Sequence, residues 1–170
     1  MKRVNFEFKA RVKDEAAVRA ALKRLRARYV GRDHQVDTYF KVSQGRLKLR
    51  EGKIENALIF YNRSNAARPR SARVEMALLA RRNGVKAVLT KALDVRVVVD
   101  KRREIYFVGN VKIHLDRVRG LGKFVEVEAL ARGGNLAQAR RQALKFQKLF
   151  AIKHSDIVGK SYADLKELVH

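Results

Sequence analysis

Residues 112–129 read KIHLDRVRGLGKFVEVEA, and this stretch decides the fold because its pattern recurs along the rest of the chain. On both sides of the central GLG, apolar side chains alternate with charged ones, a period of two that is typical of a β-strand with one buried face. The polar faces of these two predicted strands carry Lys112, His114, Asp116, Glu126 and Glu128. The stretch therefore predicts two strands that present charges of both signs at regular spacing.

The same alternation, interrupted by a few helical segments, runs along the remainder of the chain. It predicts eight strands, at 3–13, 35–42, 46–52, 56–63, 72–80, 95–108, 110–118 and 122–131. Apolar residues at helical spacing predict helices at 14–29, 84–94, 135–150 and 161–169. Asp14 is expected to cap the first helix and Gly31 to end it. Tight links between the strands favour antiparallel pairing, so we expect one α+β domain spanning residues 1–170.

The composition narrows the class of partner. The chain has 170 residues, with 40 Lys and Arg against 17 Asp and Glu, a formal charge of +23 that favours polyanions such as nucleic acid or phosphorylated molecules. Cysteine is absent, which excludes disulfides and thiolate metal sites. The start MKRVNFEFKA lacks the apolar core of a signal peptide, and no apolar run reaches the length of a bilayer span. A cytoplasmic location without a membrane partner is the expectation.

Acidic and basic residues are segregated among the predicted strands. Carboxylates collect on the first, seventh and eighth strands, whereas bases collect on the third, fourth and sixth. For any single strand, a solvated outer face explains the charges. Taken together, the segregation also suits a triphosphate with its cation, because Arg and Lys hold phosphate oxygens while Mg²⁺ takes carboxylate ligands. This pattern alone names no enzyme.

Six short motifs show a resemblance to a known family. They are QVDTYF (35–40), GRLKLRE (45–51), LIFYNR (58–63), VDKRREIYFV (99–108), KIHLDRVRGLGKFVEVEA (112–129) and SYADL (161–165). Their order and spacing resemble those of CYTH-domain proteins of the triphosphate tunnel metalloenzyme superfamily, in the class IV adenylate cyclase-like branch. The resemblance implies a closed eight-stranded antiparallel β-barrel with helices packed outside, in which the charged strand faces line a tunnel.

The resemblance also implies roles for individual residues. The metal, Mg²⁺ or Mn²⁺, is expected at Glu7, Asp116, Glu126 and Glu128. The triphosphate is expected at Lys9, Lys48, Arg50, Arg63, Lys101 and Arg103. Tyr39 and Tyr61 are candidates for orienting water or a leaving group, although both also suit packing positions. Lone histidines are more often structural than catalytic, so His114 is left out of the expected site.

The family's activities leave several substrates open. They are cyclisation of ATP to cyclic AMP and pyrophosphate, and hydrolysis of thiamine triphosphate, nucleoside triphosphates or inorganic triphosphate. One departure stands in the first strand, where the family pattern Glu-x-Glu-x-Lys reads Asn5-Phe6-Glu7-Phe8-Lys9. Because this charge is lost, an alternative hypothesis is that the barrel binds nucleotide or polyphosphate without turnover. A less favoured hypothesis is that the basic helices associate with nucleic acid. The sequence is also compatible with a homodimer.

Overall fold

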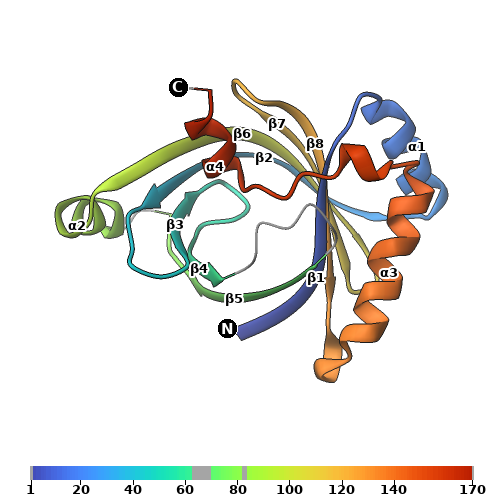
Figure 1. Cartoon of the computed structure of the whole chain (residues 1–170), viewed down its shortest axis with the longest axis horizontal. Coiled ribbons are helices and arrows are strands. Elements are labelled where there is room, and N and C mark those ends of the chain that lie inside the picture. The colour runs from blue at the N-terminus through green and yellow to red at the C-terminus, as the bar shows by residue number, and fades with distance from the viewer. Residues whose placement is uncertain (1, 63–69, 82–83, 170) are drawn as a thin grey trace.

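The computed structural model of the chain describes residues 2–62, 70–81 and 84–169. Eight antiparallel strands form a closed barrel in the order β1-β5-β4-β3-β2-β6-β7-β8, with helices outside it (Figure 1). The strands are β1 (Lys2–Arg11), β2 (Arg28–Phe40), β3 (Arg46–Glu51), β4 (Ala57–Asn62), β5 (Arg70–Leu78), β6 (Val95–Val108), β7 (Val111–Val118) and β8 (Gly122–Leu130). The α-helices are α1 (Glu15–Arg24), α2 (Val85–Ala92), α3 (Leu136–Leu149) and α4 (Tyr162–Glu167). The expected α+β fold with a closed eight-stranded barrel is confirmed.

The barrel closes because β1 pairs on both of its edges. It pairs with β5 through Asn5 opposite Ala72, and with β8 through Lys9 opposite Glu126. Side chains at alternate positions of a strand point to opposite faces, so one set enters the lumen and the other faces the helices. Closure also removes the unpaired edges that an open sheet would expose.

The outer core lies between the barrel and the helices α1 and α3. Phe6 and Phe8 of β1 pack there with the apolar outer faces of β7 and β8, and α3 contributes Phe146. From α1 come Val18 and Leu22, each 2% exposed or less. Both helices therefore lie on the same side of the barrel (Figure 1). Their apolar stripes fix them there, because an amphipathic helix must bury one face.

The first helix is shorter than the sequence pattern predicts. It ends at Arg24 rather than near Gly31, because Arg26 takes a left-handed conformation with φ 51° and Arg28 already pairs with Phe107 of β6. Tyr29, expected to continue the helix, instead pairs with Tyr106. Gly31 sits at an irregularity in this pairing with φ 146°, which favours glycine. Long-range strand pairing has overridden local helical spacing here.

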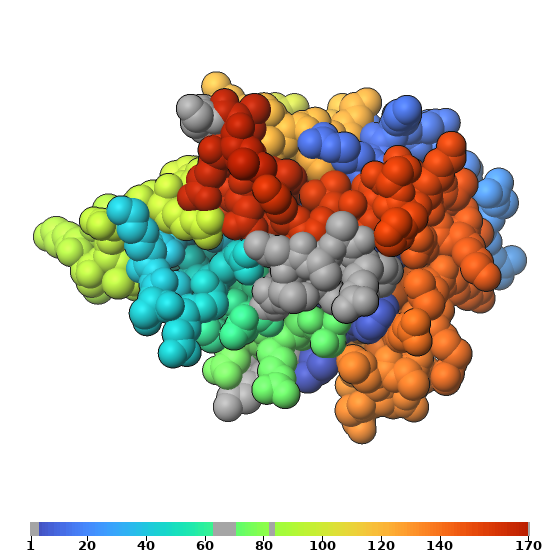
Figure 2. All heavy atoms as spheres, in the orientation of Figure 1, coloured from blue at the N-terminus to red at the C-terminus, as the bar shows by residue number. Residues whose placement is uncertain are grey.

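A C-terminal segment crosses the barrel before α4. Ile157 forms an isolated antiparallel bridge with Ala10, and the Val158 N–H donates to the Lys9 carbonyl at 2.8 Å. Ser161 then caps α4 by accepting from the Asp164 N–H. This segment and α4 are the red atoms packed along one side of the barrel in Figure 2. Within the described residues, no helix is long and apolar enough to span a bilayer.

Candidate active site in the barrel lumen

The lumen encloses a hollow with about 820 Å³ of empty space, part of it open to solvent. Among the described residues, six bases and seven acids line it or lie buried in its wall. The bases are Lys9, Lys48, Arg50, Lys101, Arg103 and Lys112, and the acids are Glu7, Asp33, Asp37, Glu55, Asp116, Glu126 and Glu128. This set therefore carries no net positive charge. Of the predicted triphosphate-binding residues, Arg63 lies outside the described residues, and the other five gather here.

Asp37 is the common anion of three predicted phosphate-binding bases. It is 0% exposed, and its carboxylate accepts from Lys48 at 2.9 Å, from Lys101 at 2.6 Å and from both Nε and Nη2 of Arg50. Burial alone would raise the pKa of Asp37, but the three cations outweigh it and hold the pKa well below its ordinary value. Sequence analysis did not single out this residue. The signal was present, because Asp37 shares the lumen parity of Tyr39.

Asp116 is held by protein donors on both oxygens. Arg103 donates to it through Nε at 2.7 Å and Nη2 at 2.5 Å, and the Tyr162 hydroxyl donates at 2.8 Å. Arg103 also donates to Glu126 at 2.6 Å, so one buried guanidinium joins two predicted metal ligands. Tyr162 comes from α4 and was not predicted as a site residue. The structure thus brings Asp116 to the site in contact with Arg103 and Tyr162.

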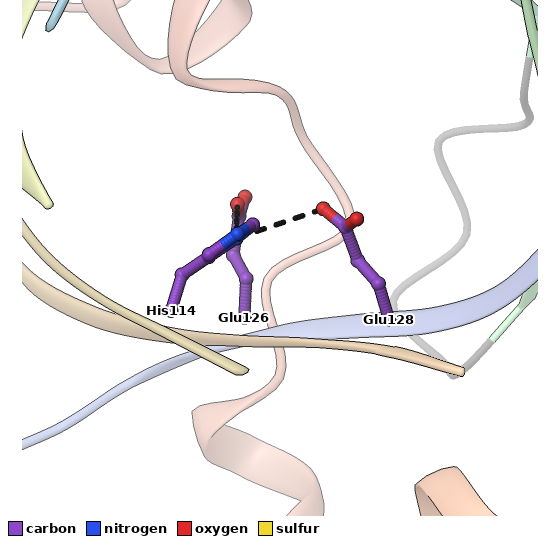
Figure 3. A group of neighbouring side chains, drawn as sticks. All are labelled: His114, Glu126 and Glu128. Atoms are coloured by element: carbon purple, nitrogen blue, oxygen red, sulfur yellow. Dashed lines mark ion pairs between the residues drawn. The ribbon is translucent and has the colours of Figure 1, made fainter. Parts of the chain in front are cut away.

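Glu126, Glu128 and His114 form the one group of possible metal donors found among the described residues (Figure 3). One donor atom from each lies within 4.8 Å of the others. His114 Nδ1 lies 3.5 Å from Glu126 and 3.7 Å from Glu128, and neither buried ring nitrogen makes a hydrogen bond. His114 was left out on the sequence pattern because a single histidine carries no spacing signal. Its parity with Asp116 did place it on the lumen face.

The protonation of this group suits a cation. Burial and the nearby Arg103 lower the pKa of His114, which favours the neutral imidazole. Burial would raise the pKa of Glu126, but Lys9 and Arg103 hold it well below its ordinary value, so the carboxylate is ionised. A neutral imidazole and ionised carboxylates are the forms that bind metals. A buried imidazole with two unsatisfied nitrogens beside two carboxylates fits a divalent ion.

Strand β1 contributes the predicted pair Glu7 and Lys9. Glu7 lines the lumen opposite Glu128 in the strand register, but it lies outside the donor group of His114. Lys9 Nζ lies 3.1 Å from Glu126 and 3.7 Å from the centroid of the Tyr162 ring. Asn5 also lines the lumen and is 9% exposed, so the departure from the family pattern falls at the site itself.

A loop between β3 and β4 brings a carboxylate that sequence analysis missed. Buried Asp33 accepts from the N–H groups of Lys53, Ile54 and Glu55 and so folds the loop inward. Gly52 permits this approach, because a Cβ there would lie 2.5 Å from Asp33. The loop lacks strand alternation, which is why the pattern gave no signal.

The folded loop delivers the Glu55 carboxylate to the lumen. It accepts from Arg50 at 2.9 Å and from Lys112. Burial would raise the pKa of Glu55, but these two cations hold it far below its ordinary value. Glu55 is therefore an anion that balances two of the bases in the lumen.

The wall formed by β4 and β5 is apolar at its described positions. It presents Ile59 and Tyr61 from β4, and Ala72, Val74 and Met76 from β5. The predicted Tyr39 and Tyr61 both line the lumen, and the Lys48 ammonium lies 5.3 Å and 5.7 Å from their ring centroids. The lumen thus has a charged side and an apolar side.

Fold and site together define a class of protein: a closed antiparallel barrel whose lumen holds paired bases, carboxylates and a cluster of metal donors. The sequence profile of the CYTH domain matches residues 4–162. The chain belongs to the CYTH domain family, whose members act on triphosphates in such a tunnel and use divalent metals.

Three related proteins illustrate the match. "Putative adenylate cyclase MJ0240" of Methanocaldococcus jannaschii is 23% identical over 97% of this chain and 99% of its own length. The PH1012 protein of Pyrococcus horikoshii has a similar structure, with a TM-score of 0.82, 22% identity and coverage of 95% and 98% of the two chains. A Hippeastrum protein, named as a "putative adenylyl cyclase" with a dominant triphosphatase activity, gives a TM-score of 0.65 at 15% identity over 97% and 96%.

Proposed function

We propose that the chain is a divalent-metal-dependent enzyme that acts on an organic triphosphate inside the barrel. The observation that carries this proposal is that phosphate-binding bases and possible metal donors contact each other in the same lumen. Lys9 and Arg103 both contact Glu126, and Glu126 is itself part of the donor group with His114 and Glu128. Bases that hold phosphate oxygens and donors that hold a cation are therefore joined by a shared carboxylate.

The charge balance of the lumen supports metal dependence. The described lining and wall hold six bases and seven acids, so they offer no net positive charge to an incoming anion. A triphosphate brings about four negative charges, and burying them without new countercharge is costly. Divalent ions bound together with the substrate would supply that charge and would polarise phosphoryl oxygens. The residues that would hold such an ion are Glu126, Glu128 and His114. Glu7 and Asp116 lie nearby on the lumen faces of β1 and β7.

The other residues position the substrate. Arg50 and Lys48 are oriented by Asp37, and Arg103 is oriented by Asp116, so these donors are fixed before a phosphate arrives. Fixed donors stabilise charge that develops on the transferring phosphoryl group without reorganising, which is the main catalytic contribution expected in such a site. Arg63, Tyr39 and Tyr61 keep the roles that the family resemblance implies.

The apolar wall favours an organic substrate over inorganic triphosphate. Ile59, Val74 and Met76 offer no donor to a phosphate but provide a surface for a nucleoside or thiamine group. The relatives' names fit this direction, because the Methanocaldococcus jannaschii protein is named a putative adenylate cyclase, and the Hippeastrum protein is named as a putative adenylyl cyclase with a dominant triphosphatase activity. Cyclisation of ATP and hydrolysis of an organic triphosphate are the two reactions that the proposal admits.

A product assay tests the proposal. ATP, thiamine triphosphate and inorganic triphosphate are each incubated with Mg²⁺ or Mn²⁺, and cyclic AMP, pyrophosphate and phosphate are separated. We expect metal-dependent turnover that is faster for an organic triphosphate than for inorganic triphosphate, and that EDTA abolishes. Turnover of inorganic triphosphate alone would contradict the role given to the apolar wall.

The variant Asn5→Glu separates an enzyme from a receptor. An enzyme is expected to show turnover in the native chain. If the native chain binds a triphosphate in calorimetry without turnover, and Asn5→Glu creates activity, the barrel is a receptor whose cation site is weakened. The control is Asn62→Glu, because Asn62 is exposed on β4.

Direct metal binding tests the donor group without relying on activity. Mn²⁺ titration followed by electron paramagnetic resonance should show binding that weakens about 10-fold or more in His114→Gln, the scale seen when metal-site residues are altered. His34→Gln is the matched control, since His34 is exposed and pairs with Asp100. Equal Mn²⁺ affinity in the native chain and His114→Gln would remove His114 from the metal site.

A further inference from the structure

The large positive charge of the chain lies outside the barrel. Of the described residues, 24 exposed side chains are Lys or Arg, whereas only four are Asp or Glu. The described residues of the lumen and its wall, by contrast, include six bases and seven acids and so contribute no net positive charge. The catalytic proposal therefore leaves the exterior charge unexplained, and net charge of this size creates a field that attracts polyanions.

Bases unaccompanied by acids collect on α1 and α3. No acid occurs in residues 16–32, which begin just after Glu15 at the start of α1, or in residues 129–155, which contain α3. We call their exposed bases the α1–α3 basic face: Lys23, Arg24, Arg26, Arg140, Arg141, Lys145 and Lys148. None of these seven forms an ion pair with another described residue, whereas exposed Lys41 and Lys86 elsewhere do.

Helix α3 arranges part of this face as a stripe. Arg141, Lys145 and Lys148 are spaced at i, i+4 and i+7, so they project from one side of the helix at intervals of about 6 and about 4.5 Å along its axis. The opposite side, with Ala139, Ala143 and Phe146, is buried against the barrel. A convex row of bases contacts a long phosphate backbone from outside, whereas a small phosphate needs a concave pocket.

We propose that the α1–α3 basic face binds nucleic acid through its phosphate backbone. A membrane surface fits less well, because Val18, Leu22 and Phe146 turn into the core. The exposed leucines of α3, Leu136 and Leu149, stand at opposite ends of the helix and form no continuous apolar face to insert between lipids. An exposed aromatic ring favours nucleic acid further. Tyr29 follows the basic segment of α1, is 52% exposed and lies 5.0 Å from Tyr106, which packs on the same outer core. Such a ring can stack on an unpaired base.

The experiment measures binding of a fluorescent 20-nucleotide single strand across a salt series. The test variant is Arg141→Gln/Lys145→Gln/Lys148→Gln. The control, Arg73→Gln/Arg81→Gln/Lys91→Gln, removes the same charge from exposed bases elsewhere. At 100 mM salt we expect the test variant to bind at least about 10-fold more weakly, with a log–log salt slope reduced by about 2, as the loss of three phosphate contacts predicts. The control should change affinity less than about 2-fold.

Three outcomes would overturn the proposal. Equal weakening in both variants would mean that the binding is a diffuse effect of net charge. Equal affinity for the strand and for vesicles containing phosphatidylserine would favour an anionic surface in general. No binding at 100 mM salt would remove the site. Metal-dependent turnover and the thermal midpoint of both variants should match those of the native chain, because neither set touches the lumen.

Discussion

The inside and the outside of this barrel carry charge in opposite ways. In the lumen, each described base faces a carboxylate, as Arg103 faces Asp116 and Lys48 faces Asp37. On the α1–α3 basic face, Arg141 and Lys145 have no ion-pair partner among the described residues. Burial explains the difference, because an unpaired charge is costly in the interior, whereas water solvates it at the surface.

This comparison separates two uses of the same residue types. Interior bases are fixed by acids and form a rigid set of donors, which suits the recognition of one small anion. Exterior bases are solvated and mobile in their side chains, which suits contact with a long polyanion whose binding depends on salt. Substitutions in the lumen should therefore change stability or activity strongly, whereas substitutions on the exterior should change them little.

The largest effect is expected from Asp37→Asn. The change removes the anion that three buried cations share, and breaking a buried pair typically costs about 3–5 kcal/mol in the free energy of unfolding. Urea denaturation measures it. The control is Asp94→Asn, because Asp94 and its partner Lys41 are both mostly exposed and should contribute about 0–1 kcal/mol. Similar losses in both variants would contradict the comparison.

The next largest effect is expected on kcat when the guanidinium of Arg103 is replaced. In Arg103→Lys the charge remains, but the fork that contacts Asp116 and Glu126 together is lost. We expect kcat to fall about 100-fold, the usual cost of one positioned donor. Arg102→Lys, at the exposed residue that precedes Arg103 in β6, should leave kcat unchanged. A native-like kcat in Arg103→Lys would place the reaction away from this residue.

A smaller effect is expected where the exterior charge is locally balanced. Glu104 accepts from Arg19, Arg32 and Tyr106, and although burial opposes it, these bonds lower its pKa to about 2. Because the folded pKa is depressed, the stability that Glu104 contributes is present above pH 5 and is lost as the pH falls towards 2. Urea midpoints at pH 6, 4 and 3 should therefore decline less steeply in Glu104→Gln. An unchanged slope would show that other carboxylates set it.

The smallest effect is expected from Lys145→Gln. This residue is exposed on α3 without an ion-pair partner among the described residues, so the free energy of unfolding should change by no more than about 0.5 kcal/mol. Thermal denaturation at low and high salt measures the change. A loss above 1 kcal/mol would show that the face stabilises the fold.

Strand alternation predicted the strands and their charged faces because it is a local signal, whereas the closed barrel and the roles of its residues were implied by the resemblance to the CYTH family. Lys9, Lys48 and Arg103 could be assigned to one face of their strands by parity alone, and all three line the lumen. The end of α1 could not be found this way, because the pairing of Tyr29 with Tyr106 depends on a strand far along the chain.

The site residues that the sequence analysis missed were each missed for a separate physical reason. Glu55 depends on a loop folded by Asp33, and Tyr162 depends on where α4 docks, so neither follows from a strand pattern. His114 had the right parity, but only the structure shows its two unsatisfied nitrogens beside Glu126 and Glu128.

The bridge between β1 and the segment before α4 has a consequence for how the protein folds. Lys9 meets the ring of Tyr162 although the two residues are about 150 positions apart in the chain. Contacts of such high sequence separation form late, because the entropy of closing the intervening loop must be overcome first, and barrels rich in them fold in milliseconds to seconds. Partly folded chains with a formed outer core would thus hold strands and helices but no complete catalytic lumen, so activity would recover later than secondary structure on refolding.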